Sequence, residues 1–213
     1  MISSSWVEHA PFAFWLVEQH RPRTIVELGT HAGYSLLCFC QVVKTLGYAA
    51  QVSAIDTWKG DEHNGFYAED VLRALRAYHQ PRYGAFSTLI QAAFDDALPR
   101  FADSSIDMLH IDGRHYYEDV KHDFETWRPK LSERAVVLFH DTQVRDRGFG
   151  VHRLWSEISS RAPNFEFLHG NGLGVLGYGR DIAPPVFRLL GLPGDSDIAA
   201  TVRAAYRRLG KAC

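Results

Sequence analysis

Cysteine is scarce in this chain. Only three of its 213 residues are cysteines, at Cys38, Cys40 and Cys213. The first two lie two positions apart in a segment with helical periodicity, where such neighbours point in different directions. They give no disulfide framework and no zinc-binding pattern. A reducing cytoplasm is therefore the expected location.

The chain also lacks a long apolar run and an excess of one charge. Its first six residues have neither the basic start nor the apolar core of a signal peptide, and no segment approaches the roughly 20 apolar residues of a membrane span. The 23 basic and 25 acidic side chains are interleaved and leave a net charge of −2. We therefore expect no membrane and no nucleic acid among the partners.

Apolar runs of strand length alternate with segments of helical periodicity along most of the chain. Hydrophobic residues make up 46% of the sequence and charged residues 23%, as in ordinary globular proteins. Parallel β-α units produce this alternation, and their ligands bind outside the carboxyl ends of the strands. We predict strands at residues 24–28, 51–55, 87–90, 105–111, 135–139, 165–168 and 175–178.

The fold class expected from this pattern is α/β, with a Rossmann-like, doubly wound sheet of seven strands and helices on both faces. The sheet should be mostly parallel, but the last two strands are joined by the turn-rich segment 169–172, which suits an antiparallel C-terminal hairpin. After residue 180 the pairs Pro184-Pro185 and Pro193-Gly194 bracket short segments. We predict one domain over residues 1–180 and a helical tail or linker over residues 181–213.

The first predicted strand ends in a glycine-containing turn. Gly29 and Gly33 are spaced differently from the G-x-G-x-x-G dinucleotide fingerprint, but they let the backbone approach a ligand closely; an ordinary tight turn is the alternative. Glu27 precedes the turn, and a buried carboxylate there needs a partner such as the ammonium of an amino-acid ligand or a backbone N–H. Asp56 ends the next strand, where it can accept both hydroxyls of a ribose.

Four segments together resemble a known enzyme family. They are Val-Glu-Leu-Gly-Thr-His-Ala-Gly-Tyr-Ser at 26–35, Ile-Asp-Thr-Trp-Lys-Gly-Asp at 55–61, Ile-Asp-Gly-Arg-His-Tyr at 111–116 and Leu-Phe-His-Asp-Thr at 138–142. In this order they resemble the class I S-adenosylmethionine-dependent methyltransferases. More narrowly, they resemble the branch that methylates hydroxyls of sugars and other small molecules, including methyltransferase domains fused to glycosyltransferases. The resemblance extends over about residues 10–180.

This resemblance implies that S-adenosylmethionine binds at the ends of the first strands. Trp58 either lies against the adenine or belongs to the core. The other residues implied to contact the cofactor are Glu27, Gly29, Thr30, Gly33 and Ser35 around its methionine part, Asp56 at the ribose, Ala93 near the adenine, and Asp112.

Two aspartates, Asp112 and Asp141, end the fourth and fifth predicted strands. Neighbouring strands lie about 5 Å apart, so the two carboxylates should be close enough to repel. Either one is protonated or a cation lies between them, and oxygen ligands suit Mg²⁺ or Mn²⁺. The alternative is that Asp112 only caps the next helix. Members of the family that use a metal usually carry an acid or amide beside the second aspartate, where this chain has His140 as a third candidate ligand.

His115 is the candidate catalytic base. It follows Asp112 by three residues, and its side chain titrates near neutral pH; sugar O-methyltransferases with a similar Asp-x-x-His pair use it as metal ligand and base. Methyl transfer needs the acceptor hydroxyl aligned with the S–CH₃ bond and relieved of its proton. Four side chains either line the acceptor pocket or are ordinary surface residues: His63, Tyr67, Tyr116 and Tyr117. The other histidines are interpreted as ordinary: His9, His20, His79, His122, His152 and His169.

The predicted function is therefore O-methylation of a hydroxyl of a sugar, polyol or other small molecule, with a divalent metal as a candidate second cofactor. A nicotinamide oxidoreductase is a poorer match because the glycine spacing is wrong, and a nucleic-acid methyltransferase would carry an Asn/Asp-Pro-Pro-aromatic segment where this chain has residues 111–114. A non-catalytic interaction module of the same fold, within a larger glycosyltransferase-like assembly, is the alternative. A homo-oligomer or a fused glycosyltransferase domain is compatible with either.

Overall fold

A seven-stranded sheet forms the centre of the protein. The computed structural model describes residues 4–63, 65–66 and 69–212. The strands are Thr24–Leu28 (β1), Gln51–Asp56 (β2), Ser87–Gln91 (β5), Ile106–Ile111 (β6), Leu131–His140 (β7), Asn164–Phe167 (β8) and Leu173–Gly177 (β9), and all seven were predicted to within a few residues. A separate pair, Gly60–Asp61 (β3) and Gly65–Phe66 (β4), was not.

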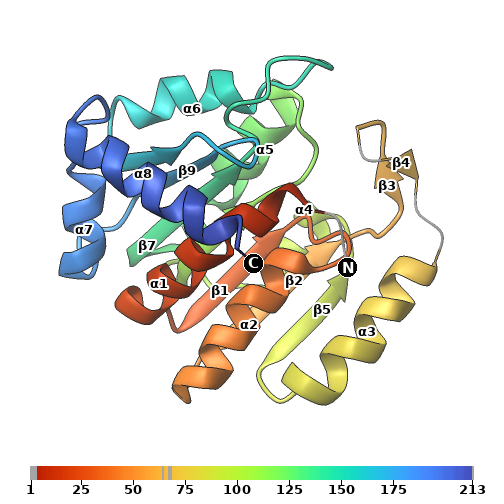
Figure 1. Cartoon of the computed structure of the whole chain (residues 1–213). Coiled ribbons are helices and arrows are strands. Elements are labelled where there is room, and N and C mark those ends of the chain that lie inside the picture. Colours follow the sequence, from red (N-terminus) through yellow and green to blue (C-terminus); the bar gives the residue numbers. More distant parts are fainter. Residues whose placement is uncertain (1–3, 64, 67–68, 213) are drawn as a thin grey trace.

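The strand order confirms the predicted fold class. It is β5-β2-β1-β6-β7-β9-β8, and the first five of these strands pair in parallel. Strand β9 pairs antiparallel with both β7 and β8, which makes the expected C-terminal hairpin. The carboxyl ends of the central parallel strands therefore meet at one edge of the sheet (Figure 1).

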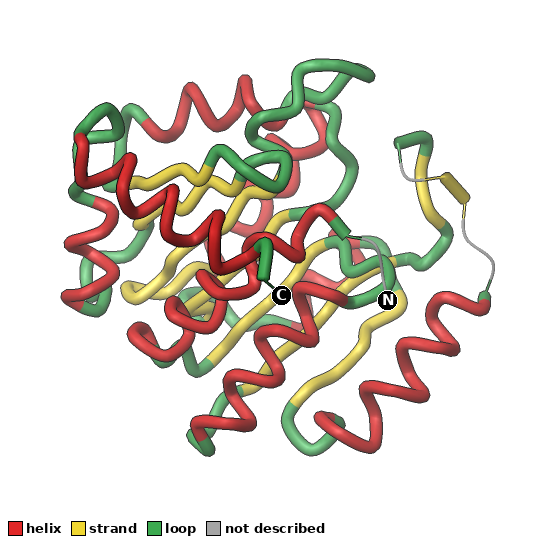
Figure 2. The backbone as a smooth tube through the Cα atoms, in the orientation of Figure 1, coloured by secondary structure: helices red, strands yellow, loops and turns green. Residues whose placement is uncertain are grey.

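Helices cover both faces of the sheet (Figure 2). The longer helices are Ala10–His20 (α1), Tyr34–Leu46 (α2), Asp70–Tyr83 (α3), Tyr117–Trp127 (α5), Val151–Ser159 (α6), Pro184–Leu190 (α7) and Asp197–Gly210 (α8). Shorter turns are Ser5–His9 (η1), Phe94–Ala97 (α4), Leu98–Arg100 (η2) and Arg128–Lys130 (η3).

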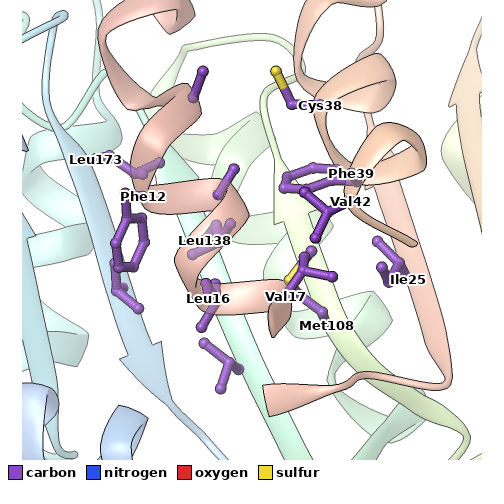
Figure 3. Close-up of a cluster of buried hydrophobic side chains, with 14 of the residues drawn as sticks. Phe12, Leu16, Val17, Ile25, Cys38, Phe39, Val42, Met108, Leu138 and Leu173 are labelled. Atoms are coloured by element: carbon purple, nitrogen blue, oxygen red, sulfur yellow. The ribbon is translucent and has the colours of Figure 1, made fainter. Parts of the chain in front are cut away.

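The core lies in two layers because side chains alternate along each strand. Ile25 and Met108 face α1 and α2 (Figure 3). Val26 and Leu28, on the other face of β1, pack in the cluster that also contains residues of α5 and α6. Phe12, Phe39 and Trp127 are fully buried and anchor their helices on the sheet. Both layers are stabilised by the apolar surface that they remove from water.

Two glycines fix the turn between β1 and α2. Gly29 has φ +85°, and a Cβ at this position would overlap the backbone carbonyl of Asp112. Gly33 has φ +86° and precedes the first residue of α2, where a Cβ would press on the side chain of Leu75. A left-handed backbone and this close packing both require glycine. The ends of β1 and β6 consequently lie very close together.

The segment after residue 180 packs on the sheet-covering helices. Helix α7 and helix α8 contact α1, and α8 also contacts η1 (Figure 1). Val186 and Ala199 are fully buried in these contacts. The domain boundary at residue 180 stays a prediction. Within the described part of the chain, every helix is too short or too polar to cross a bilayer.

Candidate active site

Two adjoining cavities lie at the carboxyl ends of the central strands. Their volumes are about 230 Å³ and 200 Å³, and Gly29, His31 and Asp112 belong to the walls of both. Of the residues predicted from the sequence, Asp56 and Ala93 line the first cavity, and Thr30, Gly33, Ser35, His115, His140 and Asp141 line the second. The predicted cofactor residues and the predicted metal ligands thus share one edge of the sheet.

Asp56 organises the wall of the first cavity. Its Oδ2 accepts the backbone N–H groups of Thr30 and His31, each at 2.9 Å, and its Oδ1 accepts the N–H of Trp58 at 2.7 Å. His31 and Trp58 both have positive φ, so the carboxylate stabilises two left-handed residues of the surrounding loops. A carboxylate offers about four lone-pair sites; these contacts occupy both on Oδ2 and one on Oδ1, so one site on Oδ1 is left for a ligand.

Trp58 is a buried residue that contacts the cavity wall through His31. Its side chain is 3% exposed and packs with Leu72 and Leu75 in a small cluster of its own. The indole Nε1–H donates to the carbonyl of His31 at 2.8 Å. These are the contacts of a core residue, which is one of the two interpretations of Trp58 given above. They also fix the position of the loop that carries His31.

Glu27 lies fully buried in β1, and its partner is a histidine. Its Oε2 is 3.0 Å from Nδ1 of His110 on β6, and Nε2 of His110 accepts the indole N–H of Trp6 at 3.1 Å. The other oxygen, Oε1, has no hydrogen-bond partner among the described residues. Sequence reasoning anticipated an ammonium or a backbone N–H beside Glu27 and missed His110 and Trp6, since neither stands in a motif.

Four side chains form a compact cluster in the wall of the second cavity. Nε2 of His115 lies 2.9 Å from Oδ2 of Asp141 and 3.7 Å from Oδ1 of Asp112. Nδ1 of His140 lies 3.3 Å from Asp112 and 3.4 Å from Asp141. The predicted proximity of the two aspartates is therefore seen, with an imidazole on either side of the pair.

In this cluster, charge pairing shifts the pKa values more than burial does. Burial acts to raise the carboxyl pKa values, but the charge of His140 and hydrogen bonds from His115 and His140 hold the pKa of Asp112 well below its usual range and also lower that of Asp141. Burial acts to lower the imidazole pKa values, yet the two carboxylates raise the pKa of His115 to about 9 and that of His140 well above its usual value. Two carboxylates and two protonated imidazoles thus neutralise one another.

The cluster has a histidine-rich support on the side of the β8–β9 turn. The carbonyl of Gly170 accepts Nε2–H of His140 at 3.0 Å and Nε2–H of His9 at 3.1 Å. His9 stacks on His169, with ring centroids 4.9 Å apart. Burial, followed by the charge of His140, lowers the pKa of His9 to about 3. His9 and His169 therefore pack against the support of His140, and their interpretation as ordinary histidines stays a prediction.

Aromatic side chains cover the other side of the cluster. The ring of His115 stacks on that of Phe149, with centroids 4.3 Å apart. The ring centroid of His63 lies 4.5 Å from those of both Phe149 and Tyr116. Nε2–H of His63 donates to the carbonyl of Arg147 at 2.8 Å, which joins the β3–β4 turn to the loop after β7. Of the predicted acceptor residues, His63 and Tyr116 are therefore near His115. Tyr117 instead bonds Glu157, and Tyr67 lies outside the described residues.

The same cluster can be tested as a metal site. Asp112, His115 and Asp141 each offer one ligand atom, and these atoms lie within 4.8 Å of one another. Oδ1 of Asp141 is buried and has no hydrogen-bond partner within the described segments. Two carboxylate oxygens with an imidazole nitrogen are a chemically reasonable donor set for a divalent ion. The residues therefore fit a metal.

Comparison with known proteins identifies the family. A family profile described as a methyltransferase domain matches residues 26–142, from β1 through the end of β7. This chain belongs to that methyltransferase family. The match includes the glycine turn and both cluster aspartates, and the resemblance inferred from the four sequence segments is confirmed.

One curated relative is close in sequence. The methyltransferase chain is 52% identical over 180 residues to an uncharacterised protein of Sinorhizobium fredii, y4gI. The aligned segment covers 84% of this chain and 20% of that protein. The chain thus spans about a fifth of the length of its relative.

Solved structures share the fold at low sequence identity. The O-methyltransferase TomG of Streptomyces achromogenes, in complex with S-adenosylmethionine, has a TM-score of 0.60 at 16% identity, covering 84% of this chain and 82% of that one. A methyltransferase of Geobacter sulfurreducens has a TM-score of 0.58 at 18% identity, covering 82% and 80%. The S-adenosylhomocysteine-bound methyltransferase PaMTH1 of Podospora anserina has a TM-score of 0.55 at 15% identity, covering 83% and 88%. The fold is that of known methyltransferases.

Proposed function

We propose that this methyltransferase transfers the methyl group of S-adenosylmethionine to a hydroxyl of a sugar, polyol or other small molecule. The observation that carries the proposal is the cluster of Asp112, His115, His140 and Asp141 in the wall of a cavity at the strand ends. Such a cluster provides a base and ligands for a divalent ion beside the cavity. A non-catalytic interaction module has no use for this arrangement, so the enzyme is favoured.

In this proposal the cofactor spans both cavities. Its methionine part occupies the second, beside Gly29, Thr30, Gly33 and Ser35, and its adenosine part occupies the first. Asp56 binds the ribose, with the one lone pair of Oδ1 that its backbone contacts leave free accepting a ribose hydroxyl. Ala93 lies beside the adenine. The complexes of TomG with S-adenosylmethionine and of PaMTH1 with S-adenosylhomocysteine support this choice of cofactor.

Asp112 and Asp141 would hold the divalent ion, Mg²⁺ or Mn²⁺, with His140 as the third ligand predicted from the sequence; the group of ligand atoms within 4.8 Å of one another has His115 in that place, and we assign His115 to the base instead. Nε2–H of His140 is fixed by the carbonyl of Gly170, so Nδ1 is the ring atom that faces the two carboxylates. Hydrogen bonds of this kind orient metal-binding histidines in other proteins. When bound, the ion would polarise the acceptor hydroxyl and lower its pKa.

His115 is the proposed base. The carboxylates of Asp112 and Asp141 raise its pKa to about 9, after burial has acted in the opposite direction. A divalent cation held by the two carboxylates would offset their charges and lower the pKa of His115. In its neutral form the His115 ring accepts the proton of the acceptor hydroxyl. Stacking on Phe149 keeps the ring in place for this transfer.

The acceptor is proposed to bind against His63, Tyr116 and Phe149. These side chains pack around His115, and aromatic rings are groups on which a ring-shaped ligand can stack. TomG is named as an O-methyltransferase, which supports a hydroxyl as the acceptor group. We propose a cytoplasmic location, since Cys38 and Cys40 are buried thiols that form no disulfide. Association with a glycosyltransferase domain or a second copy stays a prediction.

The first test is calorimetric titration with S-adenosylmethionine, with and without Mg²⁺ or Mn²⁺, and with NAD as the control ligand. We expect micromolar binding of S-adenosylmethionine and none of NAD. A panel of sugars and polyols is then incubated with methyl-labelled cofactor, and products are identified by mass spectrometry. Label found on nitrogen or carbon instead of oxygen would contradict the proposed acceptor class, and binding of NAD alone would contradict the cofactor.

A further inference from the structure

Three buried side chains form a continuous hydrogen-bonded chain beneath the second cavity. Trp6 Nε1 lies 3.1 Å from Nε2 of His110, and Nδ1 of His110 lies 3.0 Å from Oε2 of Glu27. Trp6 is 2% exposed, and both other residues are fully buried. The three residues come from η1, β6 and β1, so they connect the N-terminal segment to the centre of the sheet.

Hydrogen-bond chemistry fixes the direction of this chain. An indole N–H only donates, so Nε2 of His110 must accept and the ring proton must lie on Nδ1. That proton is donated to Glu27. Trp6 thereby selects the tautomer of His110 that can bind the carboxylate. Edge-to-face packing of Trp6 against Phe39 and His110, at centroid distances of 5.5 Å and 5.3 Å, holds the indole in this position.

Glu27 retains an unused acceptor close to the cofactor cavity. Its Oε1 is buried and has no partner among the described residues. A buried carboxylate oxygen without a donor is unfavourable and calls for a cation or a further N–H. Glu27 is not in the wall of the second cavity, but it precedes Gly29 by two residues, roughly 7 Å along the strand, and both Gly29 and Trp6 line that cavity. The missing partner is therefore expected from the ligand of that cavity.

We propose that Trp6 and His110 are positioning residues that hold Glu27 for the α-ammonium group of S-adenosylmethionine. This inference rests on the proposed placement of the methionine part in the second cavity. The relay of Trp6 and His110 acts on the amino-acid end of the cofactor and leaves the adenosine end unaffected. An adenosine ligand without that end should therefore bind independently of the relay.

The test compares two ligands on variants of the full chain. Trp6→Phe keeps an aromatic ring and removes the N–H donor, and it should weaken binding of S-adenosylmethionine about tenfold, as expected for one lost hydrogen bond in the relay. Binding of 5′-methylthioadenosine, which has the nucleoside and sulfur but no amino-acid group, should change less than twofold. Trp127→Phe is the matched control, because Trp127 is fully buried and its Nε1 has no partner within the described residues; it should change neither affinity.

Two variants of His110 separate positioning from packing. His110→Asn places an amide N–H near the position of Nδ1 and should retain more affinity for S-adenosylmethionine than His110→Ala. Melting temperatures of all variants identify any loss of fold. Equal weakening of both ligands by Trp6→Phe, or no weakening of either, would overturn the relay while leaving the cofactor assignment intact. Failure of the unaltered protein to bind S-adenosylmethionine would overturn the cofactor assignment and the relay together.

Discussion

Replacing Asp56 with alanine tests how the first cavity is built. Three backbone N–H groups, from Thr30, His31 and Trp58, would lose their acceptor. A hydrogen bond to a charged group contributes about 1.5–3 kcal/mol. Water can replace part of this here, since all three bonds lie at least partly exposed, so we expect a loss of about 2–4 kcal/mol. For a protein of this size that corresponds to a drop in Tm of roughly 5–15 °C, together with loss of cofactor binding.

Thermal unfolding by circular dichroism measures the change in stability, and calorimetry measures cofactor affinity. Asp103→Ala is the control, because Asp103 is 73% exposed and makes one ion pair, with Lys130; exposed pairs contribute at most about 1 kcal/mol. Asp56→Asn retains one acceptor oxygen and should lie between the alanine variant and the unaltered protein. If Asp56→Ala melts within about 2 °C of the unaltered protein, the three backbone contacts do not stabilise the turn and the reasoning is refuted.

Three further predictions concern the base, the glycine turn and pH. His115→Ala should lower turnover about 10²–10⁴-fold with little change in cofactor affinity, measured by single-turnover kinetics; unchanged turnover would exclude it as the base. Gly29→Ala should destabilise the protein by at least about 2 kcal/mol more than Gly47→Ala, because both glycines have positive φ but only Gly29 is packed against backbone; equal denaturation midpoints would contradict this. Burial raises the pKa of Asp123 to about 7, so the folded state binds this proton more tightly than the unfolded state, and stability falls as pH rises from about 4 to about 7. Asp123→Asn should remove up to roughly 4 kcal/mol of that fall, and an unchanged pH slope of the unfolding free energy would refute it.

The parallel part of the fold was predictable because each strand ends in a recognisable residue. Gly29, Asp56, Asp112 and Asp141 stand where an apolar run stops, and the length of the intervening segments requires crossover helices. The strand pair β3–β4 has only two residues per strand, too few for any periodicity. Helix α7 begins with two prolines, a helix-start signal that reads equally well as a break in the chain.

The site was predictable only where its residues stand in motifs. His115 and Asp112 are three residues apart, but Trp6 and His110 are separated by 104 positions and meet through tertiary packing alone. His110 is itself a fully buried residue of β6, and no motif of the sequence surrounds it. Local spacing cannot report such contacts, because they depend on how η1 packs across β6.

The reversed direction of β9 has a consequence for how this enzyme can change. A strand that runs against its neighbours begins at the edge where they end, so the short turn before β9 delivers Gly170 to the rear of the histidine cluster. The turn joins β8 to β9 without a crossover helix, and it packs on His9 and Gln143. A change within residues 168–172 would therefore alter the environment of His140 while the ends of β1 and β2 keep their sequence.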